Sequence, residues 1–256
     1  MTTLPRPAAL ASILTLAHGI ALGACSRAGS SGAAGSGPSA SAAAVARTAG
    51  SGSASFSPEP ASAGEEQAVR AIFLQYREAI AKGRGETAAG LVSEKTLDYF
   101  ERMRVAALSM PAAEVKRSPV MDRTMILITR ARIGKDDLER WHGRELFVHA
   151  VDQGWVGKEA QRLEPDAVTI DGGTASLGLH SGTDIVTPAQ GFRLYREPGG
   201  WKLDVISVAR ADGASMRAVE KELAQIDPDP NRALEKVVEK LTGKPVSAEI
   251  WQPLQR

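Results

Sequence analysis

The chain has 256 residues, of which 24% are charged and 5% aromatic, with 31 basic and 30 acidic side chains and one cysteine. A near-neutral chain has no general electrostatic attraction for nucleic acid or for anionic lipid, so we expect no nucleic-acid partner. A single cysteine cannot form a disulfide within the chain, so the folded part must be stabilised by its core alone.

Residues 1–24 have the features of a secretory signal peptide. Arg6 is their one Lys or Arg side chain, and the apolar run over residues 8–22 is too short for a stable membrane anchor. A short buried helix is the alternative, but the tract that follows offers no apolar face for it. We therefore predict export and cleavage.

The apolar run ends in Leu22-Gly23-Ala24-Cys25, which resembles the lipobox of bacterial lipoproteins. The resemblance implies a lipidated Cys25 (a diacylglyceryl group on sulfur and an acyl chain such as palmitate on the new amine), which anchors the protein to a membrane of the cell envelope. Ser26 at the second mature position resembles the enterobacterial pattern for the periplasmic face of the outer membrane. A free thiol is the alternative. Cleavage would remove Arg6, leaving 30 basic and 30 acidic side chains.

A tract of Ser, Gly and Ala follows, and we assign residues 25–64 to the lipidated cysteine and a disordered tether. The composition buries too little apolar surface to offset the entropy of ordering the backbone. A flexible chain of this length has a typical span of about 35 Å. A glycosylated or partner-bound stalk is the alternative.

We predict an α+β domain over residues 65–210 and a helical extension over residues 211–256. The first helix has apolar residues at the 3.6-residue period and a stop at Gly83. The second opens at Ser93. Residues 119–132 suit a strand or a helix, and we favour a helix. Two more helices are predicted from DDLERW and from RELFVHAVDQG.

After Trp155 the apolar period drops to two, which predicts two hairpins. The first turns at Asp171-Gly172-Gly173 and the second at Pro198-Gly199-Gly200. The second hairpin is expected to form one buried face, made of Phe192, Leu194, Trp201, Leu203 and Val205.

Two helices are predicted in the extension. One covers SMRAVEKELAQI, and the other runs to Leu241 with Asp229 as N-cap, Pro230 at its first position and Gly243 as its stop. The apolar side of this second helix packs on the domain or covers a partner, and we favour packing.

The order of helices followed by antiparallel strands, with AIAKGRGETAAGLVSEKTLDYF early and GFRLYREPGGWKLDVI late, resembles the cone-shaped fold of the nuclear transport factor two-like group, which includes ketosteroid isomerases. The resemblance covers roughly residues 65–210. It implies N-terminal helices packed on a curved antiparallel sheet. No residue here aligns with the catalytic residues of those enzymes.

Candidate chemical groups are few, since the sequence lacks GxSxG, HExxH, phosphate-loop, GxGxxG and CxxC motifs. His149 and Asp152 are three residues apart on a predicted helix, a spacing that suits a general base oriented by an acid. A helix-face hydrogen bond near the helix end is the simpler interpretation. His180 with Asp184 lacks a third ligand, so we predict no metal and no cofactor. Tyr76, Tyr99 and Trp141 are expected in the core, and Trp201 as a packing anchor.

Three functions remain open. The first is a lipid-anchored envelope protein whose domain binds a protein or a small hydrophobic ligand without catalysis. The second is an enzyme of the same fold that performs proton transfer or hydrolysis. The third is an envelope assembly subunit that acts through its C-terminal helices. Ionisable groups inside the domain would favour the second, an aliphatic interior the first, and an exposed apolar face on residues 231–241 the third.

Overall fold

The computed structural model describes residues 63–156, 158–181, 184–186, 191–207 and 213–254. The predicted signal peptide, Cys25 and nearly all of the predicted tether lie outside these ranges. The described chain is of the α+β class, with helices and one antiparallel sheet. No helix within these ranges has an apolar stretch long enough to cross a bilayer.

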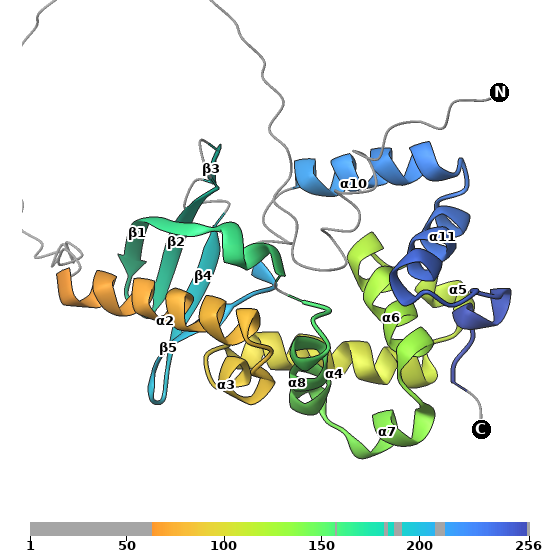
Figure 1. The fold of residues 1–256 in the computed structure, drawn as a ribbon, viewed down its shortest axis with the longest axis horizontal. Coiled ribbons are helices and arrows are strands. Elements are labelled where there is room, and N and C mark those ends of the chain that lie inside the picture. Colours follow the sequence, from red (N-terminus) through yellow and green to blue (C-terminus); the bar gives the residue numbers. More distant parts are fainter. Residues whose placement is uncertain (1–62, 157, 182–183, 187–190, 208–212, 255–256) are drawn as a thin grey trace, which may run out of the picture.

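The first helix, α2 (Ala63–Ala81), lies along one face of the sheet (Figure 1). Its buried positions recur at the predicted helical period, and they are Val69, Phe73, Tyr76, Ala79 and Ile80. Gly83 adopts a left-handed conformation with φ of 58°, and its N–H donates to the carbonyl of Ile80 at 3.1 Å. The helix therefore ends as the sequence predicts.

The sheet is built from both predicted hairpins. β1 (Glu164–Asp171) pairs with β2 (Thr174–Ser181), and β4 (Phe192–Glu197) pairs with β5 (Gly200–Asp204), in the order β1-β2-β4-β5. The short β3 (Asp184–Val186) was not predicted, and it pairs with the same edge of β2 that β4 pairs with further along.

Gly191, just before β4, allows β4 to pair with the same edge of β2 that β3 uses further along. A Cβ atom at this position would lie 1.9 Å from the carbonyl oxygen of Leu177 in β2, so only glycine allows the strand to approach. The register then places Phe192 opposite Leu177, while Val186 of β3 lies opposite Leu179.

The face of the sheet that meets α2 is apolar, as predicted. The rings of Phe73 in α2 and Phe192 in β4 lie 5.7 Å apart. The other predicted residues of the second hairpin are also buried, namely Leu194, Trp201, Leu203 and Val205. The core of this half is therefore the interface between one long helix and the strands.

A group of helices continues the core beyond the sheet. α3 (Gly85–Ala89), α4 (Glu94–Ser109) and α8 (Gly143–Asp152) pack together, and the rings of Phe100 and Phe147 meet edge to face at 5.1 Å. Gly143 makes this close packing possible, since a Cβ there would lie 2.4 Å from the carbonyl oxygen of Leu97.

Next in the chain come α5 (Ala112–Val115), α6 (Val120–Arg132) and α7 (Lys135–Arg140). The ambiguous segment 119–132 is helical, as we favoured. Its apolar pattern resembles a strand because α6 is covered on most sides, and residues 126–130 are all buried in succession.

The predicted C-terminal extension packs on the helices over its described residues 213–254. It contains α10 (Gly213–Ile226), α11 (Pro230–Thr242) and the short helix η2 (Ala248–Trp251), while η1 (Lys158–Arg162) precedes the sheet. Asp229 caps α11 by accepting from the N–H of Asn231 at 2.8 Å, and Gly243 ends it with φ of 68°. In Figure 1, α10 and α11 lie at the opposite end of the molecule from the sheet.

Candidate functional site

The predicted pair His149 and Asp152 lies on α8. This helix starts at Gly143, and Glu145 stabilises its first turn by accepting from the backbone N–H of His142 at 2.8 Å. That hydrogen bond is the main reason why the pKa of Glu145 is lowered. The helix and its ends thus follow from the sequence.

The two side chains do not pair as a base and its orienting acid, the arrangement for which they were candidates. Asp152 is exposed, and its Oδ1 accepts a hydrogen bond from the backbone N–H of Gly85 at 2.7 Å. No hydrogen bond joins His149 to Asp152 in the part of the chain that the structure describes. Asp152 therefore caps the N-terminus of α3 from a neighbouring helix, and it does not orient the imidazole.

His149 lies instead between two indole rings. Its ring centroid is 5.0 Å from that of Trp141 and 5.0 Å from that of Trp155. The half-buried setting lowers the pKa of His149 by desolvation, while the charges of Asp152 and Asp137 act in the opposite direction. As the pH falls below about 6.5, the ordinary pKa of a histidine, the imidazole of His149 therefore stays neutral to a lower pH than it would in water.

Arg132 extends this row of rings. Its guanidinium lies 4.7 Å from the centre of the Trp155 ring, and it donates a hydrogen bond to the carbonyl oxygen of Leu241, in the last turn of α11. A row of contacting side chains thus links the α7–α8 junction with the end of α11, in the order Trp141, His149, Trp155 and Arg132. A general base needs an oriented proton acceptor beside a bound substrate, and here the imidazole is a packing element.

The second histidine candidate is on the sheet. His180 is half-buried in β2, opposite Glu164 in β1 and Ile185 in β3. Asp184 begins β3, and the structure describes its backbone only. Within the described ranges, no group of three or more His, Cys, Asp or Glu side chains could hold a metal ion.

A buried carboxylate that we did not predict lies where β5 meets α4. Asp204 accepts from the N–H of Ile206 at 3.1 Å, and its Oδ1 is 3.5 Å from the hydroxyl of Thr96 in the first turn of α4. The N–H of Ser93 donates to the carbonyl of Leu203 at 2.9 Å. The carboxylate is therefore placed at the positive end of a helix, which suits a structural joint.

A highly connected side chain in the described part of the protein is Arg130 of α6, which is only 7% exposed. Its five N–H groups all donate to backbone carbonyl oxygens. On α4 and the residue after it, the acceptors are Ala106, Ala107 and Met110, at 3.0, 2.9 and 2.7 Å. On η2 they are Ile250 and Trp251, at 3.2 and 2.6 Å. Arg130 therefore fastens residues 250–251 to the end of α4.

Arg130 has no carboxylate partner among the described residues, although it stays charged. Burial lowers the pKa of its guanidinium to about 10, which leaves it protonated at neutral pH. The negative end of α4 offsets part of the charge. The sequence held a signal for this residue, because Arg130 directly follows the apolar run MILIT, but spacing alone does not distinguish a buried arginine from an exposed one.

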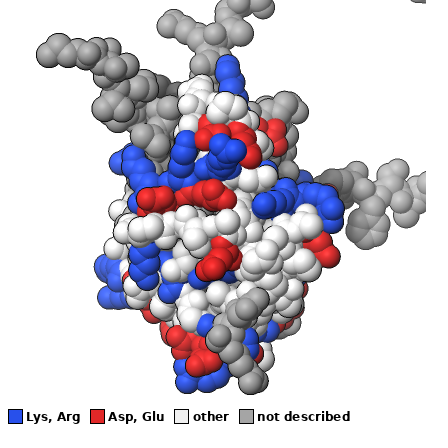
Figure 2. Space-filling model, turned by 90° about the vertical axis from the view of Figure 1, so that its right-hand side faces the viewer, with Lys and Arg blue, Asp and Glu red and all other residues white. Residues whose placement is uncertain are grey.

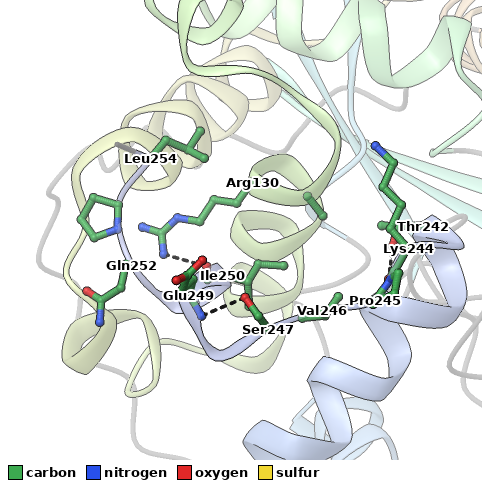
Figure 3. A pocket seen from close by; sticks show the side chains of 12 residues that line it. Arg130, Thr242, Lys244, Pro245, Val246, Ser247, Glu249, Ile250, Gln252 and Leu254 are labelled. Atoms are coloured by element: carbon green, nitrogen blue, oxygen red, sulfur yellow. Dashed lines mark hydrogen bonds between the residues drawn. The ribbon is translucent and has the colours of Figure 1, made fainter. Parts of the chain in front are cut away.

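Arg130 also lines a half-open cavity of about 600 Å³ beneath the C-terminal segment (residues 243–254). Figure 3 shows Arg130 reaching from α6 toward η2, with Leu254 and Gln252 on one side and Val246 and Pro245 on the other. Ligand cavities are commonly of this size, with apolar walls and a few polar groups. Sequence analysis did not predict this cavity, because residues from α6 and the chain end are more than a hundred positions apart.

The predicted aromatic positions are largely confirmed. Tyr76, Tyr99 and Trp201 are buried, and Trp141 is half-buried against His149. Leu234, Val237 and Val238 of α11 are also buried, which confirms that this helix packs on the domain. Basic and acidic side chains are interleaved on the face shown in Figure 2, without a broad area of one sign.

Comparison with known proteins adds no assignment: the chain matches no protein-family model, and searches of curated proteins and of solved structures find no significant match.

Proposed function

We propose that this protein is a lipid-anchored lipoprotein of the bacterial cell envelope, whose domain binds a ligand or a protein without catalysis. The observation that carries the proposal is the sequence Leu22-Gly23-Ala24-Cys25 at the end of an apolar run, followed by 38 residues rich in Ser, Gly and Ala. The first described helix begins at Ala63, where that tract ends. An anchor, a tether and a folded domain are thus arranged in order.

Binding is favoured over catalysis by the interior between α2 and the sheet. The side chains that α2 buries there are apolar, except for the phenol of Tyr76. Burial raises the pKa of Tyr76, which makes the phenol a poor proton donor and no base at neutral pH. This aliphatic interior supports the first of the three functions considered above.

The assembly alternative has less support. An assembly subunit that acts through its C-terminal helices would need an exposed apolar face on residues 231–241. Leu234, Val237 and Val238 of this segment are instead buried. Among the described residues, the exposed large hydrophobic side chains are Leu74 and Val105, on two different helices. They do not form a patch of the kind that marks a stable protein interface.

The finer description of the fold is part of the proposal. We place the domain in the cone-shaped architecture of the nuclear transport factor two-like group, with α2 lying across the concave side of a curved sheet. The helical part from α5 to α8 would then be an insertion. The periplasmic face of the outer membrane is the proposed location, from Ser26 at the second mature position.

Membrane fractionation of a Cys25→Ser variant tests the anchor. The wild-type protein is expected in the membrane pellet after a carbonate wash, and the variant in the supernatant. Ser26→Ala is the matched control, because it changes the next residue and leaves the lipidation motif intact. A Cys25→Ser protein that stays in the washed membranes would refute the proposal, and so would a wild-type protein without acyl groups by mass spectrometry.

A further inference from the structure

The cavity beneath the C-terminal segment combines a buried cation with aliphatic walls. Arg130 lies on the α6 side, 7% exposed and without an ion pair among the described residues. A buried charge is ordinarily paired, because removing it from water costs several kcal/mol. An anion that binds in an open volume beside such a cation has a stronger electrostatic attraction to it than it would have in water.

The charge around the cavity favours an anion. Lys244, on the rim, is exposed and forms no ion pair in the described structure, while Glu249 supplies the one acidic side chain of the described lining. Two cations and one anion leave a net positive site.

The rest of the lining is suited to a hydrocarbon chain. Val246, Ile250 and Leu254 are half-buried and face the cavity, together with Ala131 of α6. About 600 Å³ is larger than a short aliphatic chain needs, so that a chain with one polar end fits within it.

We propose that this cavity binds a small amphipathic carboxylate. The carboxylate lies against Arg130, Lys244 adds positive charge on the rim, and the chain lies against the aliphatic wall. The proposal rests on the binding function proposed above, and it names the ligand class and the site.

One hydrogen bond of Arg130 is weaker than the others and is the one that a ligand carboxylate can replace. Four of its bonds to carbonyl oxygens measure 2.6–3.0 Å, while the bond from Nη1 to Ile250 is the longest, at 3.2 Å. Ile250 also lines the cavity. A carboxylate oxygen makes a stronger, charge-assisted bond than a neutral carbonyl, so it can replace this one while the other four persist.

Calorimetric titration with sodium octanoate tests the site, using the full-length chain with Cys25→Ser so that no attached lipid interferes. We expect saturable binding at one site. Octanol has the same chain without the charge and should bind about tenfold more weakly, and inorganic phosphate, which has charge without a chain, should not compete. Absence of saturable binding, or equal binding of octanol, would overturn the proposal.

A pair of lysine variants locates the charge. Lys244→Glu should weaken octanoate binding about tenfold or more, because it reverses a charge on the rim. Lys240→Glu makes the same change on an exposed residue of α11 outside the cavity lining and should leave the affinity unchanged. Equal effects of the two variants would mean that octanoate responds only to overall charge, which refutes the site.

A third variant locates the chain. Ala131→Phe fills the cavity from α6 and should abolish binding, with a melting curve to show that the protein remains folded. Full binding by a folded Ala131→Phe protein would place octanoate elsewhere. These outcomes do not depend on the membrane anchor, so fractionation of Cys25→Ser and titration with octanoate can fail independently.

Discussion

The carboxylate of Asp152 in α8 accepts a hydrogen bond from the backbone N–H of Gly85, the first residue of α3, at 2.7 Å. The contact is tight, because a Cβ on Gly85 would lie 2.4 Å from the carbonyl oxygen of Val148 and 2.6 Å from Asp152 itself. A residue that we considered as a catalytic partner is thus the cap of a neighbouring helix.

Asp152→Ala should lower the free energy of unfolding by about 1 kcal/mol, the usual effect of losing a helix cap. Urea denaturation measures this. Gln153→Ala, on the next exposed residue, is the control and should change stability little. Gly85→Ala should cost more, about 2–3 kcal/mol, because the new methyl group forces α3 away from α8. An Asp152→Ala protein as stable as wild type would contradict the capping role.

His149→Ala should cost on the order of 1 kcal/mol and leave any cellular phenotype of the protein largely intact. The pH dependence is more specific. Because burial lowers the pKa of folded His149 below its unfolded value, the neutral imidazole stabilises the fold at higher pH. That contribution is lost as the pH falls below about 6.5, toward the lower folded pKa.

Melting temperatures of wild type and His149→Phe between pH 7.5 and 5 check this sign. The phenylalanine ring keeps the contacts with both indoles but cannot be protonated, so the variant should lose less stability on acidification. Parallel curves for the two proteins would show that His149 does not contribute. A His149→Ala strain that behaves like a deletion at normal protein levels would revive the enzyme.

Arg130→Met should destabilise the protein by about 3 kcal/mol, since five hydrogen bonds to a charged donor are lost and buried carbonyls remain without partners. Arg130→Lys should restore little, because an ammonium has three donors for five acceptors. Arg117→Met, an exposed arginine after α5, is the control. Urea midpoints give the comparison, and similar losses at the two positions would argue against the clamp.

Limited proteolysis should cut the chain between Ser26 and Ala63 and leave a resistant core that begins near Ala63. The tract lacks the apolar periodicity that a folded segment needs, whereas α2 buries five side chains from its first turns onward. Mass spectrometry of the fragments identifies the cut sites. Hydrogen-exchange protection of the tract equal to that of the core would contradict the tether.

Local signals in the sequence were enough for most elements. Gly83 and Gly243 end their helices, Asp229 caps α11, and the Gly172-Gly173 turn joins β1 to β2, because each of these depends on neighbouring residues only. The apolar alternation of the second hairpin likewise gave the buried face. β3 was missed since it has three residues, too few for a periodic pattern.

The site was less accessible to prediction. Spacing placed His149 and Asp152 on one helix, but it could not show that Gly85 takes the carboxylate and that Trp141 and Trp155 enclose the ring. These contacts depend on how separate helices meet. The cavity depends on the same kind of information, because Arg130 and the residues that complete its walls come from opposite parts of the domain.

Arg130 joins the end of α4 to residues 250–251, which follow Arg130 by 120 and 121 positions in the chain. A chain synthesised from its N-terminus cannot complete the five hydrogen bonds of Arg130 until residues 250–251 have been made. Until then Arg130 can bind the carbonyl oxygens at the end of α4 only, and its two hydrogen bonds to η2 are missing. Residues 250–251 are among the last to be synthesised, so the packing of the helical half is completed late in folding.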